Sequence, residues 1–190
     1  MLDILLIAAG FAVLYRALSR LESGAALSLA PRRPPSPRLV QLTDYADRLF
    51  AEKKWLAAEK AYLGVLKLDH KNAGAYMHLG IIYSTQKNFP DAIEAFGIAT
   101  RLRPSGPTFQ NLGLAYYDNK NYVKSIAAFK KAIMLEPTAP RYVGLSRAYQ
   151  KLHDQPNAVA ALEEAAKLDS GPQVAKLLHE AKADLPRPAA

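Results

Sequence analysis

Four histidines are the side chains of this sequence that could bind a metal ion or transfer a proton near neutral pH: His70, His78, His153 and His179. A zinc site on one helix uses two histidines four positions apart, and no two of these histidines have that spacing. The chain contains no cysteine, so thiolate metal sites, cysteine nucleophiles and disulfide bonds are excluded. We therefore expect no bound metal.

Paired carboxylates are another common source of catalysis, and Glu163 and Glu164 are such a pair in sequence. Neighbouring residues of a helix point in different directions, so this pair indicates a solvated surface and not acid–base chemistry. The sequence also has no glycine-rich phosphate-binding loop and no serine nucleophile elbow. We expect that the protein is not an enzyme and requires no cofactor.

A short recurring motif indicates which secondary-structure elements the chain forms. Gly80 lies within AYMHLGIIYS, Gly113 lies at the same place in TFQNLGLAYY, and Ser146 lies there in RYVGLSRAYQ. Successive copies are 33 residues apart. Self-similarity at this period is the sequence signature of stacked supersecondary units.

Units that start at Leu39, Ala73, Gly106 and Ala139 align apolar and small residues at helical spacing. The first helix of each unit has predicted core positions 4, 7, 8 and 11, which are Leu42, Tyr45, Ala46 and Leu49; Tyr76, Leu79, Gly80 and Tyr83; Phe109, Leu112, Gly113 and Tyr116; and Tyr142, Leu145, Ser146 and Tyr149. The second helix has positions 20, 24 and 27, which are Ala58, Tyr62 and Val65; Ala92, Phe96 and Ala99; Ser125, Phe129 and Ala132; and Ala158, Leu162 and Ala165. A small residue opposite a large one allows two helices to approach closely.

This pattern resembles the tetratricopeptide repeat family, whose units are helix-turn-helix pairs. The resemblance implies an all-α fold, a right-handed superhelical solenoid. We expect repeats over 39–72, 73–105, 106–138 and 139–171, followed by a capping helix over 172–185. Pro104 and Pro137 close their units, whereas His70 and Ser170 replace that proline in the first and fourth.

The resemblance also implies a function, because in this family the first helices line a concave groove that binds an extended or helical segment of a partner. The side chains expected in the groove are Met77, His78, Ile81, Gln110, Asn111, Leu114, Tyr117, Val143, Arg147 and Gln150. Their apolar members exceed what a solvated helix face needs, which indicates an apolar groove. An alternative is that some of them pack between neighbouring helices.

The N-terminus differs from the repeats, because Ile4–Tyr15 is wholly apolar. A helix over Met1–Leu18 would be about 27 Å long at about 1.5 Å per residue, close to the thickness of a bilayer core. We predict a transmembrane anchor over 1–20, and Ala8 and Ala12 indicate contact with another transmembrane helix. A cleaved signal peptide is the alternative, which would make the protein secreted or periplasmic, but it would lack a basic first region.

A linker rich in proline and arginine, 21–38, is expected between the anchor and the repeats. Five arginines follow the apolar run: Arg16, Arg20, Arg32, Arg33 and Arg38. The positive-inside rule then predicts a single-pass membrane protein whose repeat domain is cytoplasmic.

The formal net charge of +8 raises nucleic acid as an alternative partner. An RNA-binding repeat protein needs a basic track and base-reading polar side chains in its groove. The expected groove is apolar with one arginine, Arg147, so we favour a scaffold or assembly factor for proteins over an RNA-binding protein.

Overall fold

The computed structural model describes residues 35–184. The predicted transmembrane anchor over 1–20 and most of the predicted linker lie outside these residues. By its contacts the chain divides into two units, and the second, Pro37–Ala190, contains every helix discussed below. The part of the chain that is described is all-helical, as the repeat pattern predicts.

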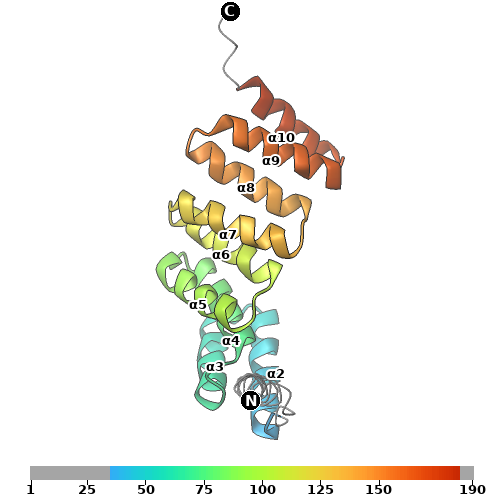
Figure 1. The fold of residues 1–190 in the computed structure, drawn as a ribbon. Coiled ribbons are helices and arrows are strands. Elements are labelled where there is room, and N and C mark those ends of the chain that lie inside the picture. Colours follow the sequence, from blue (N-terminus) through green and yellow to red (C-terminus); the bar gives the residue numbers. More distant parts are fainter. Residues whose placement is uncertain (1–34, 185–190) are drawn as a thin grey trace, which may run out of the picture. The chain divides into compact units, whose positions relative to one another are not determined.

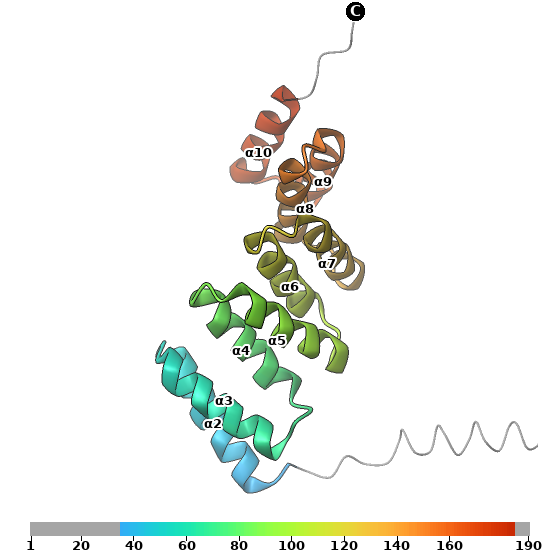
Figure 2. The same cartoon turned by 90° about the vertical axis from the view of Figure 1, so that its left-hand side faces the viewer.

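The second unit consists of helical hairpins followed by one more helix (Figure 1). Its helices are α2 (Pro37–Ala51), α3 (Trp55–Leu68), α4 (Ala73–Thr85), α5 (Phe89–Leu102), α6 (Gly106–Asp118), α7 (Tyr122–Leu135), α8 (Ala139–Lys151), α9 (Gln155–Leu168) and α10 (Pro172–Ala183). The largest contacts join α2 to α3, α4 to α5, α6 to α7 and α8 to α9, and α10 packs on α9. Figure 2 shows the hairpins following one another in chain order.

Local sequence signals set the helix starts. The side chains of Asn72, Ser105, Asn121 and Asp154 accept hydrogen bonds from backbone N–H groups of the helices that follow them. Prolines occupy the first turn of α5, α6, α8, α9 and α10, where the missing N–H would have no helical partner. Each cap or proline therefore fixes where a helix begins.

The turn inside each hairpin has a left-handed residue that is not glycine. Lys53, Lys87, Lys120 and His153 have φ values of 57°, 60°, 60° and 58°. In each case the next residue donates its N–H to a carbonyl near the end of the first helix, as Asn88 does to Tyr83 at 2.9 Å. This closing bond satisfies a carbonyl that the helix end leaves free, which fixes the entry to the second helix.

The core is built from the small and large residues that the repeat pattern singled out. Positions 8, 20, 24 and 27 are buried in all four hairpins. A Cβ atom on Gly80 would lie 2.6 Å from the Phe96 ring, so only glycine allows α4 and α5 to pack this closely. The Ser125 hydroxyl, buried at position 20, donates to the Gly113 carbonyl at 2.8 Å.

The prediction that Tyr45 belongs to the core is wrong, because its side chain is 50% exposed. Position 7 of the later hairpins is buried, at Leu79, Leu112 and Leu145. In the second hairpin this residue faces α3, the second helix of the preceding hairpin, whereas no described hairpin precedes α2. The repeat position alone could not reveal this end effect.

Candidate peptide-binding groove

The expected groove residues lie on α4, α6 and α8, the first helices of three successive hairpins. Besides packing on their hairpin partners, α4 contacts α6 and α6 contacts α8. In a stack of hairpins the layer whose helices meet directly is the inner, concave layer. Leu114 and Arg147 are exposed, and the other eight expected groove residues are half-buried.

A pocket of about 240 Å³ opens between α4 and α6 in this layer. Its lining residues are Ile81, Ser84, Thr85, Phe96, Asn111, Leu114, Ala115 and Asp118. Three of them, Ile81, Asn111 and Leu114, belong to the set expected from the sequence. We name this cavity the inner pocket.

The inner pocket combines apolar walls with a polar rim. Phe96, Ile81 and Leu114 supply apolar surface, and Leu114 is 42% exposed. Asn111 and Asp118 supply an amide and a carboxylate, and burial raises the pKa of the Asp118 carboxyl. Such a site can hold an apolar side chain while the rim accepts hydrogen bonds from its neighbours.

Thr85 and Asp118 also line the inner pocket, although the repeat pattern does not assign them to the groove. A signal was present, because Asp118 follows Leu114 by four positions and Thr85 follows Ile81 by four. Residues at this spacing share one helix face. Extending the expected face by one helical turn would have found them.

His78 lies in an aromatic cluster at the junction of the first two hairpins. Its ring centroid is 4.7 Å from that of Phe50 and 4.9 Å from that of Tyr62, on which it stacks. Its Nδ1 lies 3.7 Å from the Asp47 carboxylate, which also accepts a hydrogen bond of 2.7 Å from the Tyr62 hydroxyl. Burial lowers the pKa of His78, and the Asp47 charge opposes this only in part.

Some of the expected groove residues also pack between helices. Met77 and Ile81 pack against the cluster that contains Phe96 and Leu112. Val143 packs against buried residues of α9 and α10. These side chains therefore contribute to the joints between hairpins as well as to the concave surface.

Gln110 takes part in a hydrogen-bonded contact between hairpins that the repeat pattern does not predict. Its side-chain oxygen accepts a hydrogen bond of 3.1 Å from Nε of Arg141, a buried arginine. Arg141 also donates to the Glu136 carboxylate at 2.9 Å and to the Glu136 backbone carbonyl. The guanidinium thus ties α6 to the turn between α7 and α8. An arginine at a helix start gives no sequence signal of burial, because its usual place is the surface.

Residues 35–184 contain neither of two other types of site, a metal site and a membrane span. No three histidine or acidic side chains of this range gather closely enough to hold a metal ion. Within the same range no helix has the length and apolar character needed to cross a membrane.

The fold and the inner layer define a protein of the helical-repeat class. Sequence models of the tetratricopeptide repeat match residues 44–107, 107–139 and 139–172. The chain belongs to the tetratricopeptide repeat family, whose members mediate protein–protein interactions.

Solved structures with the same fold include MamA and YrrB. A crystal structure of MamA is 25% identical, with a TM-score of 0.69 over 73% of this chain and 82% of that chain. MamA from Desulfovibrio magneticus RS-1 is 15% identical, with a TM-score of 0.73 over 78% and 86%. YrrB, described as a tetratricopeptide repeat protein with an unusual peptide-binding site, is 18% identical, with a TM-score of 0.67 over 75% of both chains. No curated protein sequence matches the chain.

Proposed function

We propose that the protein is a membrane-anchored scaffold or assembly factor whose concave layer binds an extended or helical segment of a partner protein. The observation that carries the proposal is the inner pocket, which lies between two first helices and has an apolar wall at Leu114. The peptide-binding site described for YrrB, which has the same fold, agrees with this role.

The chemistry of the inner pocket suggests how the segment would bind. An apolar side chain would fill the space beside Phe96 and Leu114, and donors of the segment would face Asn111 and Asp118. A few such anchors usually supply most of the binding energy of an interface. RNA is a weaker candidate, because the lining includes no arginine and no lysine.

A photo-crosslinking amino acid at position 114 of the full chain would test this proposal. We expect it to capture a partner segment that the same amino acid at Leu168 does not capture, since Leu168 is 52% exposed but lies on α9. Leu114→Glu should then weaken binding of the identified segment by about tenfold or more, because it places a charge against an apolar anchor. Leu168→Glu is the matched control.

Equal capture from positions 114 and 168, or unchanged binding by Leu114→Glu, would remove the inner pocket as the recognition site. Both variants should keep the helical circular dichroism of the unaltered chain, because both residues are exposed. Crosslinks to RNA instead of protein would support the alternative function.

The membrane anchor is the second part of the proposal and rests on the sequence of residues 1–20. An apolar run without charge, followed by arginines, supports a single span with the repeats in the cytoplasm. The full chain should stay in the membrane pellet after alkaline carbonate washing, and deletion of 1–20 should release it. Release of the intact chain by carbonate would contradict the anchor, and a mature chain that starts after this segment would indicate a signal peptide.

A further inference from the structure

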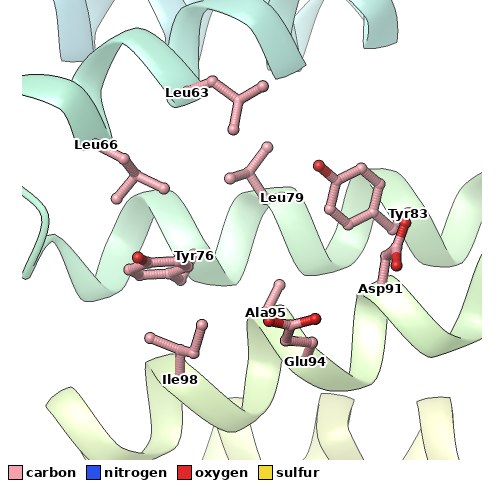
Figure 3. Close-up of a pocket in the computed structure, with 9 residues that line it drawn as sticks. All are labelled: Leu63, Leu66, Tyr76, Leu79, Tyr83, Asp91, Glu94, Ala95 and Ile98. Carbon is pink, nitrogen blue, oxygen red and sulfur yellow. The ribbon is translucent and has the colours of Figure 1, made fainter.

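A larger pocket is shown in Figure 3. Its α4 residues, Tyr76, Leu79 and Tyr83, lie on the opposite face of that helix from those that line the inner pocket. The larger pocket measures about 320 Å³ and lies over α4, between α3 and α5. Its lining residues are Leu63, Leu66, Tyr76, Leu79, Tyr83, Asp91, Glu94, Ala95 and Ile98. We name it the outer acidic pocket, because the only charged side chains among these lining residues are the two carboxylates.

The negative charge of this pocket is concentrated on α5. Asp91 lies beside Tyr83 in Figure 3, and Glu94 follows it on the same side of the helix. Glu59 of α3 adds a third carboxylate near the Tyr83 hydroxyl, whose pKa is raised by burial and by the charges of Glu59 and Asp91. A ligand that suits this pocket has an apolar group and a neighbouring cation.

The next hairpin carries a pocket of the same construction but opposite charge. A pocket of about 190 Å³ is lined by Phe109, Leu112, Tyr116, Lys124, Ala127, Ala128 and Lys131. Each of these residues is 33 positions after a lining residue of the outer acidic pocket, so Lys124 replaces Asp91 and Lys131 replaces Ile98. We name it the outer basic pocket. The repeat register places both pockets on the same side of the stack, one hairpin apart.

The lysines of the outer basic pocket lie over aromatic rings. The Lys124 ammonium is 5.7 Å from the Tyr116 ring centroid, and that of Lys131 is 5.6 Å from the Phe109 centroid. Neither lysine has an ion pair within the described residues. Their charge is thus held at the surface without a carboxylate to neutralise it.

The exposed face of α7 also presents apolar groups. Val123 is 67% exposed and Met134 is 84% exposed. With Lys124 and Lys131 they follow the helical repeat along one face of α7. This face offers an apolar group beside a cation, which is the chemistry that the outer acidic pocket requires.

We infer that two copies of this chain associate through this outer side, with α7 of each copy packed against the outer acidic pocket of the other. A twofold axis between α5 and α7 would place each α5 opposite the α7 of the second copy, so both contacts form at once. Val123 or Met134 would enter the apolar pocket, and Lys124 and Lys131 would face Asp91 and Glu94. The surface is self-complementary, so no other partner is needed to satisfy it.

The two kinds of contact have different roles in this dimer. Exposed ion pairs each contribute little affinity, so the apolar contacts supply most of the binding. The charges fix the orientation, because a parallel arrangement would place carboxylates against carboxylates and lysines against lysines.

A charge-exchange experiment tests the dimer with full chains that carry two different tags and are purified in mild detergent. Copies of the unaltered chain should co-purify. Asp91→Lys/Glu94→Lys and Lys124→Glu/Lys131→Glu should each lower self-association by on the order of tenfold or more, through like-charge contacts. A mixture of the two variants should associate again, because each α5 then faces an α7 of opposite charge.

A matched control changes the net charge as Asp91→Lys/Glu94→Lys does, but away from both outer pockets. Asp44→Lys/Glu180→Lys, at exposed positions of α2 and α10, should associate as the unaltered chain does. Two results would overturn the inference: the two charge-reversed variants fail to associate when mixed, or each of them self-associates as well as the unaltered chain does. The second result would indicate association through another surface or through residues 1–34.

Cysteine crosslinking gives a second measurement that does not depend on charge reversal. The chain has no cysteine, so an engineered pair reports a single contact. A copy with Glu94→Cys and a differently tagged copy with Lys131→Cys should form a disulfide-linked dimer on mild oxidation. The pair Asp44→Cys and Lys131→Cys should not, and equal yields from both pairs would overturn the inference.

Discussion

The α4–α5 and α6–α7 hairpins share one packing pattern, yet they differ at the interface between their helices and on their outer surface. Phe96 fills the space beside Gly80, and Phe129 fills the equivalent space beside Gly113. Outside, the pocket of the second hairpin carries the carboxylates of Asp91 and Glu94, whereas the equivalent pocket of the third carries Lys124 and Lys131. The repeat pattern therefore determines the fold, whereas the hairpins differ from one another in surface charge and in how tightly the glycine is packed.

The two phenylalanines also differ in what they contact beyond their own hairpin. Phe129 touches Gly113 of α6, and a Cβ atom on Gly144 of α8 would lie 2.5 Å from its ring. Phe96 instead lines the inner pocket next to Asn111. The third hairpin is therefore joined closely to the fourth, whereas the second leaves a pocket where it meets the third.

The largest effect is expected from Phe129→Ala. Loss of this buried ring removes packing in two hairpins, so the free energy of unfolding should fall by about 3–5 kcal/mol. Phe96→Ala should cost less, because the inner pocket beside it lets the neighbouring side chains and water fill the vacated space. Urea unfolding of both variants, followed by helical circular dichroism, measures the difference. An equal or greater loss of unfolding free energy for Phe96→Ala would show that the inner pocket does not reduce the cost of the cavity.

A smaller effect should separate Gly80 from Gly113. A Cβ atom on Gly80 would lie 2.6 Å from the Phe96 ring, but one on Gly113 would lie 3.1 Å from the Phe129 ring. Alanine gains about 1 kcal/mol over glycine in a helix, and overpacking a core costs about 1–3 kcal/mol. Gly80→Ala should therefore lower the free energy of unfolding by roughly 1–2 kcal/mol, and Gly113→Ala should leave it nearly unchanged. Thermal melting of both variants measures this difference. Similar shifts of the melting temperature for the two variants would mean that the Phe96 ring moves aside freely.

Much of the fold could be predicted from the sequence because small and large residues recur at fixed positions. Spacing alone predicts helix–helix contacts at Gly80, Gly113 and Ser146, and all three residues are buried. The left-handed turn residues could not be found this way, because Lys87 and its equivalents are not glycines. Their conformation is imposed by the hairpin and not by an intrinsic preference.

The concave surface could be predicted only in part. Periodicity identified Ile81, Asn111 and Leu114, which line the inner pocket, but it could not show which candidates also pack between hairpins. Burial of Arg141 depends on Gln110 and Glu136, which reach it from α6 and the α7–α8 turn. A contact between different hairpins leaves no trace in the pattern of any one repeat. Which of the expected residues bind a partner stays a prediction.

The smallest effect is expected from His78, whose position in the second hairpin corresponds to Asn111 in the third. Burial among Phe50 and Tyr62 lowers the pKa of His78 in the folded chain, so the unfolded chain binds a proton at higher pH than the folded chain does. The free energy of unfolding should then decrease as the pH falls below the ordinary histidine value of 6.5, until the folded pKa is passed, and this contribution is fully present above 6.5. The Asp47 carboxylate limits the loss, because it attracts the protonated ring.

His78→Asn gives the second hairpin the residue of the third and isolates this effect. The difference in unfolding free energy between the unaltered chain and His78→Asn should change between about pH 7.5 and about pH 5.5, because histidine is the group that titrates there. Since other titrating groups are common to both proteins, they cancel in this difference. Asn111→His is the reciprocal variant: its imidazole would lie beside one aromatic ring, that of Phe96, in an open pocket, whereas His78 contacts the two rings of Phe50 and Tyr62. It should therefore show a weaker pH dependence than His78 does. A pH-independent difference for His78→Asn would mean that the ring stays solvated enough to titrate alike in both states.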